Sequence, residues 1–236
     1  MIFYTNPLGY WPFKLIPYPQ WKKGYKKYYQ KLIIDPGVNN LIGKDDYPYI
    51  NDYPLEINDP KILWVIPDYP FDIKPDLSKE ECIAKTWENI LKWYKYPNTI
   101  CSVQYYVEDI DNFKENYLML YNYTNHIGIG NLCKSKKLTF LKPLINFVVN
   151  NNKENKHIHF FGLHKLGIKH LLSLNPKFEV SVDSIKWDYG LHGHRICGEE
   201  SNTRLLRWIK GLNYIKDIYE WKAFYKKQSN LENYII

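Results

Sequence analysis

The strongest constraint on the fold is an alternation of short apolar runs with longer amphipathic segments. Short apolar runs bounded by Pro, Gly or Asp are typical of buried strands, and apolar stripes at helical spacing indicate helices packed on a sheet. The predicted strands cover 31–35, 62–68, 99–105, 126–131, 156–162 and 179–185, with 1–5 as a seventh candidate. The predicted helices cover 78–94, 109–121, 138–149, 165–174 and 202–227.

Strands that alternate with helices in this way predict a parallel sheet with right-handed crossovers. An open doubly wound sheet and a closed barrel both fit; we favour an α/β fold of the (β/α)8 TIM-like barrel type, irregular or incomplete. A single domain over 1–236 is expected, because no repeat or internal boundary is visible. Segments 1–30 and 43–60 are expected to wrap the outside or the mouth of the barrel, and 200–236 to form a basic C-terminal helix.

The cellular setting is indicated by what the sequence does not contain. No apolar stretch approaches the roughly 20 residues that span a bilayer, and the start, MIFYTNPLGYWPF, does not have the pattern of a secretion signal. The four cysteines are spread along the chain without a CxxC pair, which argues against a disulfide framework or an all-cysteine zinc site. We therefore expect a cytoplasmic protein that does not interact with a membrane.

The charge distribution suggests a polyanionic partner. Residues 14–31 carry six lysines and no acid, interleaved with five Tyr or Trp residues, and the segment 203–227 is also basic. Lysine neutralises phosphate and aromatic rings stack on bases, so nucleic acid is the expected partner, although a solvated surface would have the same composition. The candidate contacts to the nucleic-acid backbone are Lys22, Lys23, Lys26, Lys27, Lys134, Arg195, Arg204 and Arg207.

Polar residues and glycines gather at the carboxyl ends of the predicted strands. A parallel barrel forms its active site at that face, because the loops that follow the strands converge there. Taken singly, each such residue could instead begin a turn or cap a helix. Their common position nevertheless predicts an enzyme-like site, with the candidates Asp35, Asp68, Gln104, Gly128, Gly130, Asn131, His164 and Asp183.

Six motifs in order over residues 31–190 resemble those of a known family. They are Asp35-Pro36-Gly37, Pro67-Asp68-Tyr69-Pro70, Val103-Gln104, the segment 128–134 (GIGNLCK), the segment 159–163 (HFFGL) and the segment 183–187 (DSIKW). The order is similar to that in the tRNA-guanine transglycosylase superfamily, and above all to its DNA-acting branch, the 7-deazaguanine DNA transglycosylases. This sequence departs from the family pattern at Pro36 and Asn131, where the family has Ser, and at Lys134, where it has Arg.

The resemblance implies a base exchange, in which guanine leaves its sugar and a 7-deazaguanine base, the co-substrate, takes its place. By resemblance Asp183 is the nucleophile that forms a covalent glycosyl-enzyme, and Asp35 is the acid/base partner. Asp68 and Gln104 would bind the purine edge, with Gly128, Gly130, Asn131, His164 and Trp187 around the base. No cofactor is implied, and the target base has to leave its stack. The chain is shorter than the tRNA enzymes, which favours DNA over tRNA.

Two other readings stay open. The chain could be a nucleic-acid-binding barrel that has lost its activity, for which Pro36 is the best support. It could also be a metal-dependent barrel hydrolase, because His192, His194 and Cys197 have the spacing of a partial zinc site. Three ligands in one loop do not complete a site, so we expect no metal and a basic substrate loop around Arg195. The positions of Asp35 and Asp183 discriminate between an active and an inactive barrel.

Overall fold

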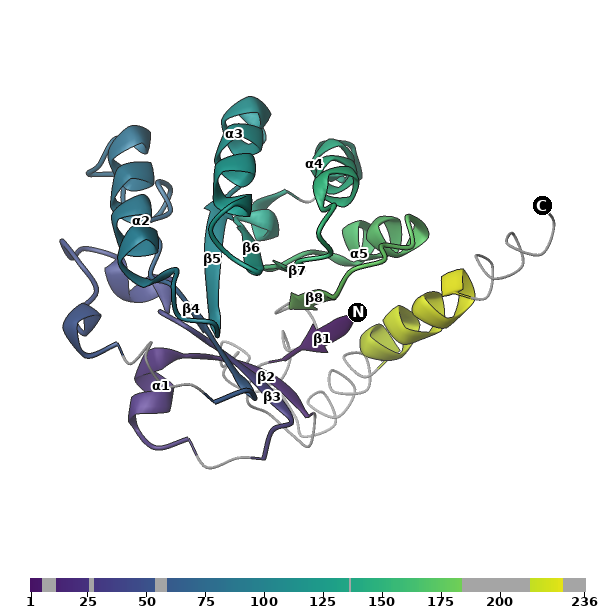
Figure 1. Ribbon diagram of the computed structural model, residues 1–236, viewed down its shortest axis with the longest axis horizontal. Helices are drawn as coiled ribbons and strands as arrows, with labels where there is room; N and C mark the ends of the chain where they lie inside the picture. Colours follow the sequence, from purple (N-terminus) through teal and green to yellow (C-terminus); the bar gives the residue numbers. More distant parts are fainter. Residues whose placement is uncertain (6–11, 26–27, 54–58, 136, 184–212, 227–236) are drawn as a thin grey trace, which may run out of the picture.

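The computed structural model describes residues 1–5, 12–25, 28–53, 59–135, 137–183 and 213–226. Eight parallel strands form one sheet in the order β1-β8-β7-β6-β5-β4-β3-β2 (Figure 1). The two edge strands meet where Thr5 pairs with Lys14, which brings the sheet to a nearly closed barrel. The predicted TIM-like α/β fold is confirmed, and an open doubly wound sheet is excluded.

The strands lie close to the predicted positions. Each of the six predicted runs contains a strand, and the seventh candidate contains β1. The bounds are β1 Ile2–Tyr4, β2 Phe13–Pro17, β3 Lys31–Asp35, β4 Ile62–Val65, β5 Thr99–Gln104, β6 His126–Gly130, β7 His157–Phe160 and β8 Val180–Asp183. Near-continuous apolar strands of this kind are expected where both faces of a sheet are covered.

The helices lie on the outer side of the strands (Figure 1). Those after β4, β5, β6 and β7 are α2 Lys79–Trp93, α3 Ile110–Tyr121, α4 Leu138–Asn151 and α5 Lys165–Ser173. Helix α2 begins with the capping box indicated by its sequence, in which Ser78 and Glu81 each bind the other's backbone N–H. Shorter helical turns are α1 Tyr18–Lys22, η1 Val38–Leu41, η2 Ile50–Asp52 and η3 Leu132–Lys134.

One expectation for the amino-terminal segment is wrong. Residues 1–30 do not only wrap the barrel, because they contain β1 and β2, two of its eight strands. Strand β2 was missed because its run, FKLIP, is interrupted by Lys14 and ends in Pro17. The Lys14 side chain is fully buried, so this lysine belongs to the barrel and not to a basic surface.

Between β3 and β4 a tyrosine-rich loop occupies the place of a long crossover helix. Its buried tyrosines donate hydrogen bonds to carbonyls at the ends of these strands. The Tyr53 hydroxyl lies 3.1 Å from the Ile34 oxygen and 3.0 Å from the Val65 oxygen, and the Tyr47 hydroxyl lies 2.8 Å from the Asp68 oxygen. Buried carbonyl groups need a hydrogen-bond donor. In this loop the tyrosine hydroxyls supply it for the carbonyls at the ends of β3 and β4.

The described part of the predicted C-terminal helix, residues 213–226, packs beside β1 and α5 (Figure 1). Ile215 and Ile218 are buried in the core between strands and helices. The Lys222 ammonium donates to the Met1 carbonyl at 3.0 Å, and Asp217 pairs with Lys165. This helix therefore occupies the place between β8 and β1 that completes the outer layer. Among the described residues, no helix is both long and apolar enough to cross a membrane.

The tyrosine hydroxyls can be tested by deletion. Tyr53→Phe removes the donor shared by two buried carbonyls while keeping the ring, so we expect the free energy of unfolding to fall by about 1–3 kcal/mol. The matched control is Tyr28→Phe, because Tyr28 is 69% exposed. Chemical denaturation of the two variants measures the difference, and an unchanged stability of Tyr53→Phe would contradict the assigned role.

Candidate active site

Four strands end on residues predicted for the site. Asp35, Gln104, Gly130 and Asp183 are the last residues of β3, β5, β6 and β8, and Asp68 follows β4 by three residues. Because all the strands are parallel, their carboxyl ends open on the same end of the barrel. The structure thus brings together the three carboxylates singled out in the sequence.

Asp35 is held by the turn that follows it. Its Oδ1 accepts the backbone N–H of Gly37 at 2.5 Å, and Gly37 has a positive φ of 69° that favours glycine. With Pro36 between them, Asp35 still accepts this N–H, and the Pro36 carbonyl itself accepts the Tyr49 hydroxyl. Burial raises the pKa of Asp35 to about 6, and the nearby charge of Asp183 adds to this rise. The two carboxylates therefore interact across the barrel mouth.

Asp68 lies in a loop fixed from three sides. Asn89 donates to the Pro67 carbonyl at 2.9 Å, and the Tyr69 N–H donates to Thr86 at 3.0 Å. The Tyr47 bond described above fixes the carbonyl of Asp68 itself.

The carboxyl group of Asp68 is 8% exposed and accepts the amide N–H of Gln104. Burial raises its pKa to about 7, and the charge of Asp35 contributes to this rise, although the bond from Gln104 opposes it. A carboxyl that titrates near neutrality at a barrel mouth is a candidate functional group.

The two glycines of β6 have different surroundings. A methyl group at Gly130 would overlap the amide of Gln104, so this glycine leaves room for Gln104 to lie flat across β6. A methyl group at Gly128 would instead meet Phe161 and Ser102, deeper in the barrel. Gly130 thus borders the predicted base pocket directly, whereas Gly128 makes room for packing beneath it.

Asp183 has two hydrogen-bond partners on one oxygen. Its Oδ1 accepts the N–H of Gly162 at 2.9 Å and lies 3.2 Å from Nε2 of His159. Within the described part of the chain, none of the hydrogen bonds reaches Oδ2. His159 was named from the sequence only within the segment 159–163 and was missed as a partner of Asp183, although His157 and His159 alternate along one strand. The same alternation at Ser181 and Asp183 on the next strand was the available signal.

Two further residues predicted to contact the base, His164 and Asn131, form hydrogen bonds with nearby backbone groups. The Nδ1 atom of His164 accepts the N–H of Leu166 at 3.2 Å and so caps α5. Asn131 has a left-handed backbone, and its side chain donates to the Tyr105 carbonyl at 3.0 Å. Both residues lie in loops at the carboxyl end of the barrel. Neither bond places a side chain against the three carboxylates.

The proposed phosphate contacts are only partly described. Lys22 and Lys23 follow β2 on the same side of the barrel as the carboxylates, and Lys134 lies in η3 after β6. Lys22 forms an exposed ion pair with Asp52 at 2.8 Å. The other predicted phosphate contacts lie outside the described part of the chain: Lys26, Lys27, Arg195, Arg204 and Arg207. Trp187, a predicted base contact, lies outside it as well.

The metal candidates His192, His194 and Cys197 also lie outside the described residues. Within the described ranges, no three His, Cys, Asp or Glu side chains are arranged to hold a metal ion. The two histidines of β7, His157 and His159, form hydrogen bonds with Ser181 at 2.6 and 2.7 Å.

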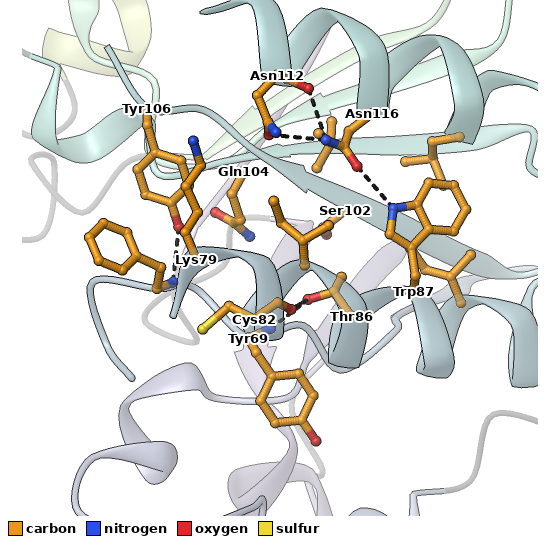
Figure 2. Close-up of a pocket in the computed structure, with 15 residues that line it drawn as sticks. Tyr69, Lys79, Cys82, Thr86, Trp87, Ser102, Gln104, Tyr106, Asn112 and Asn116 are labelled. Carbon is orange, nitrogen blue, oxygen red and sulfur yellow. Dashed lines mark hydrogen bonds between the residues drawn. The ribbon is translucent and has the colours of Figure 1, made fainter. Parts of the chain in front are cut away.

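A pocket lies between α2 and α3 over β5 (Figure 2). Its polar side chains mostly bind one another or the backbone: Trp87 donates to Asn116 at 2.9 Å, and the Phe71 N–H donates to the Tyr106 hydroxyl at 3.0 Å. Gln104 lines this pocket as well as contacting Asp68. Because most of these polar groups are already bonded to one another or to the backbone, and Trp87 with Asn116 joins α2 to α3, the barrel mouth is the better candidate for chemistry.

The comparisons with known proteins leave the site to be interpreted on its geometry. No protein-family model matches this chain, and no curated protein matches it. The site consists of a buried carboxyl and amide pair, Asp68 and Gln104, beside two further carboxylates, Asp35 and Asp183. Such a set can bind a flat polar ligand, exchange a proton near neutral pH and supply a carboxylate nucleophile.

The raised pKa of Asp68 predicts a pH-dependent stability. Between pH 4 and pH 7 the folded protein binds more protons than the unfolded chain, so the free energy of unfolding falls as pH rises. Asp68→Asn cannot ionise and should remove the larger part of this fall. At pH 8 it should be more stable than the wild type by roughly 2–4 kcal/mol.

Denaturation at several pH values measures this effect. The control is Asp111→Asn, because the Asp111 carboxylate is 82% exposed on α3. An Asp68→Asn variant with the same pH dependence as the wild type would show that Asp68 is not the group responsible.

Proposed function

We propose that this chain exchanges guanine in a nucleic acid, with DNA favoured, for a 7-deazaguanine base. The observation that carries the proposal is the convergence of Asp35, Asp68 and Asp183, with Gln104, at the mouth of one parallel barrel. The motif resemblance assigns a role in base exchange to each of these residues. Their positions agree with the division of labour that such a reaction requires.

Recognition of the purine falls to Asp68 and Gln104. A guanine presents the N1–H and the exocyclic amine as donors on one edge, and a carboxylate accepts both. With the donors in place the charged form of Asp68 is favoured, which offsets the burial that raises its pKa. Adenine lacks the N1–H donor, so it would leave the buried carboxylate partly unpaired.

The exchange itself needs two carboxylates with different tasks. In the first half, Oδ2 of Asp183 attacks C1′ of the sugar, the C1′–N9 bond breaks, and a proton from Asp35 neutralises the leaving guanine. In the second half, the incoming base gives its N9 proton to Asp35 and attacks C1′, which releases the Asp183 carboxylate. The pKa of Asp35, about 6, suits a group that gives and takes a proton near neutrality.

The reading as an inactive binding barrel has less support. Its main basis was Pro36 in place of a family Ser, but Asp35 still accepts the Gly37 N–H and interacts electrostatically with Asp183. The carboxylates that the reaction needs are therefore held at the mouth with the substitution present.

The nucleophile assignment is tested with Asp183→Asn. We expect this variant to form no covalent adduct with a guanine-containing oligonucleotide and to incorporate no labelled 7-deazaguanine base, because an amide is a poor nucleophile. Denaturing electrophoresis detects the adduct, and mass spectrometry of nucleosides measures incorporation, with DNA and tRNA as parallel substrates. Asp111→Asn serves as the control carboxylate. Incorporation by Asp183→Asn near the wild-type level would overturn the assignment.

The phosphate contacts are tested through salt dependence. Replacing Lys22 and Lys23 with Ala should flatten the slope of log affinity against log salt by about 0.7–0.9 for each phosphate that is no longer neutralised. The matched control replaces Lys153 and Lys177, exposed lysines that precede β7 and β8 and so lie at the opposite end of the barrel. Equal slopes for the two double variants would place the nucleic acid elsewhere.

A further inference from the structure

A chain of buried polar side chains runs through the barrel to Asp183. Nε2 of His159 lies 3.2 Å from Oδ1 of Asp183, and its Nδ1 lies 2.7 Å from Oγ of Ser181. The same Oγ lies 2.6 Å from Nε2 of His157, whose Nδ1 lies 3.1 Å from Nδ1 of His126. His159 and Ser181 are fully buried, and His157 is 6% exposed.

Packing alone does not explain this row of hydrogen-bonded polar side chains. The interior of the barrel on the side of β1 to β5 is filled by apolar side chains, among them Leu15, Ile33, Val65 and Ile100. The side of β6 to β8 carries the histidines and Ser181 instead, in the register that pairs His159 with Ser181. Burying polar groups costs free energy that their mutual hydrogen bonds only offset, whereas apolar residues would fill this space without that cost.

Counting the protons limits these hydrogen bonds to one direction at a time. Burial lowers the pKa of His157 well below its ordinary value, and the neighbouring His126, His159, Lys31 and chain amino group oppose its protonation as well. A neutral His157 carries one N–H, and a serine hydroxyl has one hydrogen to donate. The bonds can therefore point only one way along the chain at a time.

The two directions have opposite effects on Asp183. If His157 donates from Nε2 to Ser181, the Ser181 hydroxyl donates to Nδ1 of His159, and His159 then donates from Nε2 to the carboxylate. In the reverse direction His159 donates from Nδ1 to Ser181, which leaves the lone pair of Nε2 facing Oδ1. An ionised Asp183 is stabilised only by the first arrangement.

The donors also select which oxygen reacts. His159 and the Gly162 N–H both bind Oδ1, so the rotation of the carboxylate is fixed and Oδ2 is the oxygen left for C1′. The other groups around His159 are the rings of Tyr4 on β1 and Phe161, at 5.7 and 4.3 Å between centroids. Among the hydrogen bonds of the described residues, none joins either ring to Nε2 of His159.

We propose that His159 is a positioning residue for Asp183, held by Ser181 and His157 in the Nε2–H tautomer so that Oδ2 of Asp183 faces the sugar. This inference rests on the proposed function only for the role of Asp183 as nucleophile. The tautomer of His159 is a property of the protein without substrate. It can therefore be measured independently of base exchange.

The experiment compares Ser181→Ala with Ser102→Ala. Ser102 is a matched control: it is 4% exposed on β5, and its hydroxyl has no hydrogen-bond partner among the described residues. Nitrogen NMR of protein labelled at histidine distinguishes a ring N–H from a bare ring nitrogen, and His159→Gln identifies the signals of His159. Ser181→Thr keeps a hydroxyl at the position and is the rescue variant.

We expect the Nε2–H tautomer of His159 in the wild type, a mixture of tautomers in Ser181→Ala, and wild-type signals in Ser102→Ala and Ser181→Thr. The rate of adduct formation in Ser181→Ala should fall about 10–100-fold, by analogy with the loss of hydrogen-bond partners behind metal-binding histidines, while the KM for the oligonucleotide stays unchanged. An Nδ1–H tautomer in the wild type, or an unchanged tautomer and rate in Ser181→Ala, would overturn the inference. If the wild-type protein showed no base exchange, the proposed function would be refuted. The tautomer of His159 alone would then decide this inference.

Discussion

Closure of the sheet between Thr5 and Lys14 is the constraint on which the site depends. The N–H of Leu15 donates to the Thr5 carbonyl at 2.9 Å, and the N–H of Thr5 donates to the Phe13 carbonyl at 3.1 Å. These bonds join β1 to β2 and bring β3 and β8 to the same barrel mouth, with only two strands between them. The electrostatic interaction of Asp35 with Asp183 is a consequence of this closure.

The mouth concentrates negative charge at a cost in stability. Burial raises the pKa of both Asp35 and Asp68, and each of these rises is increased by a neighbouring carboxylate. A core optimised for stability alone would not place carboxyl groups there, and such a departure from local rules is typical of functional sites. The surrounding tyrosines and the Asn89 amide hold the loops of β3 and β4 in spite of this repulsion.

The barrel interior is divided into two parts with different tasks. Apolar residues of β1 to β5 provide the interior core, whereas β6 to β8 carry the polar chain that ends at Asp183. A parallel barrel permits this division because each strand directs alternate residues inward, so neighbouring strands can align polar residues inside without disturbing the outer core. The helices pack on the other face of the same strands.

Much of the fold could be predicted from local patterns. The bounds of β3, the capping box of α2 and the positions of α3 and α4 follow from apolar periodicity and capping residues, which depend on neighbours in the sequence. Strand β2 could not be predicted, because Lys14 is buried by residues distant in the sequence. The structure of the crossover between β3 and β4 could likewise not be predicted from apolar periodicity, since its tyrosines are held by long-range hydrogen bonds.

For the site, the sequence by itself determined that carboxylates follow several strands, and that these strands alternate with helices. Only the tertiary structure decided which carboxylates interact, that Gln104 binds Asp68, and that His159 contacts Asp183. The physical reason is that hydrogen bonds and charge interactions act over a few ångströms, whereas the residues concerned are separated by tens of positions along the chain. Closure of the barrel converts that separation in sequence into contact.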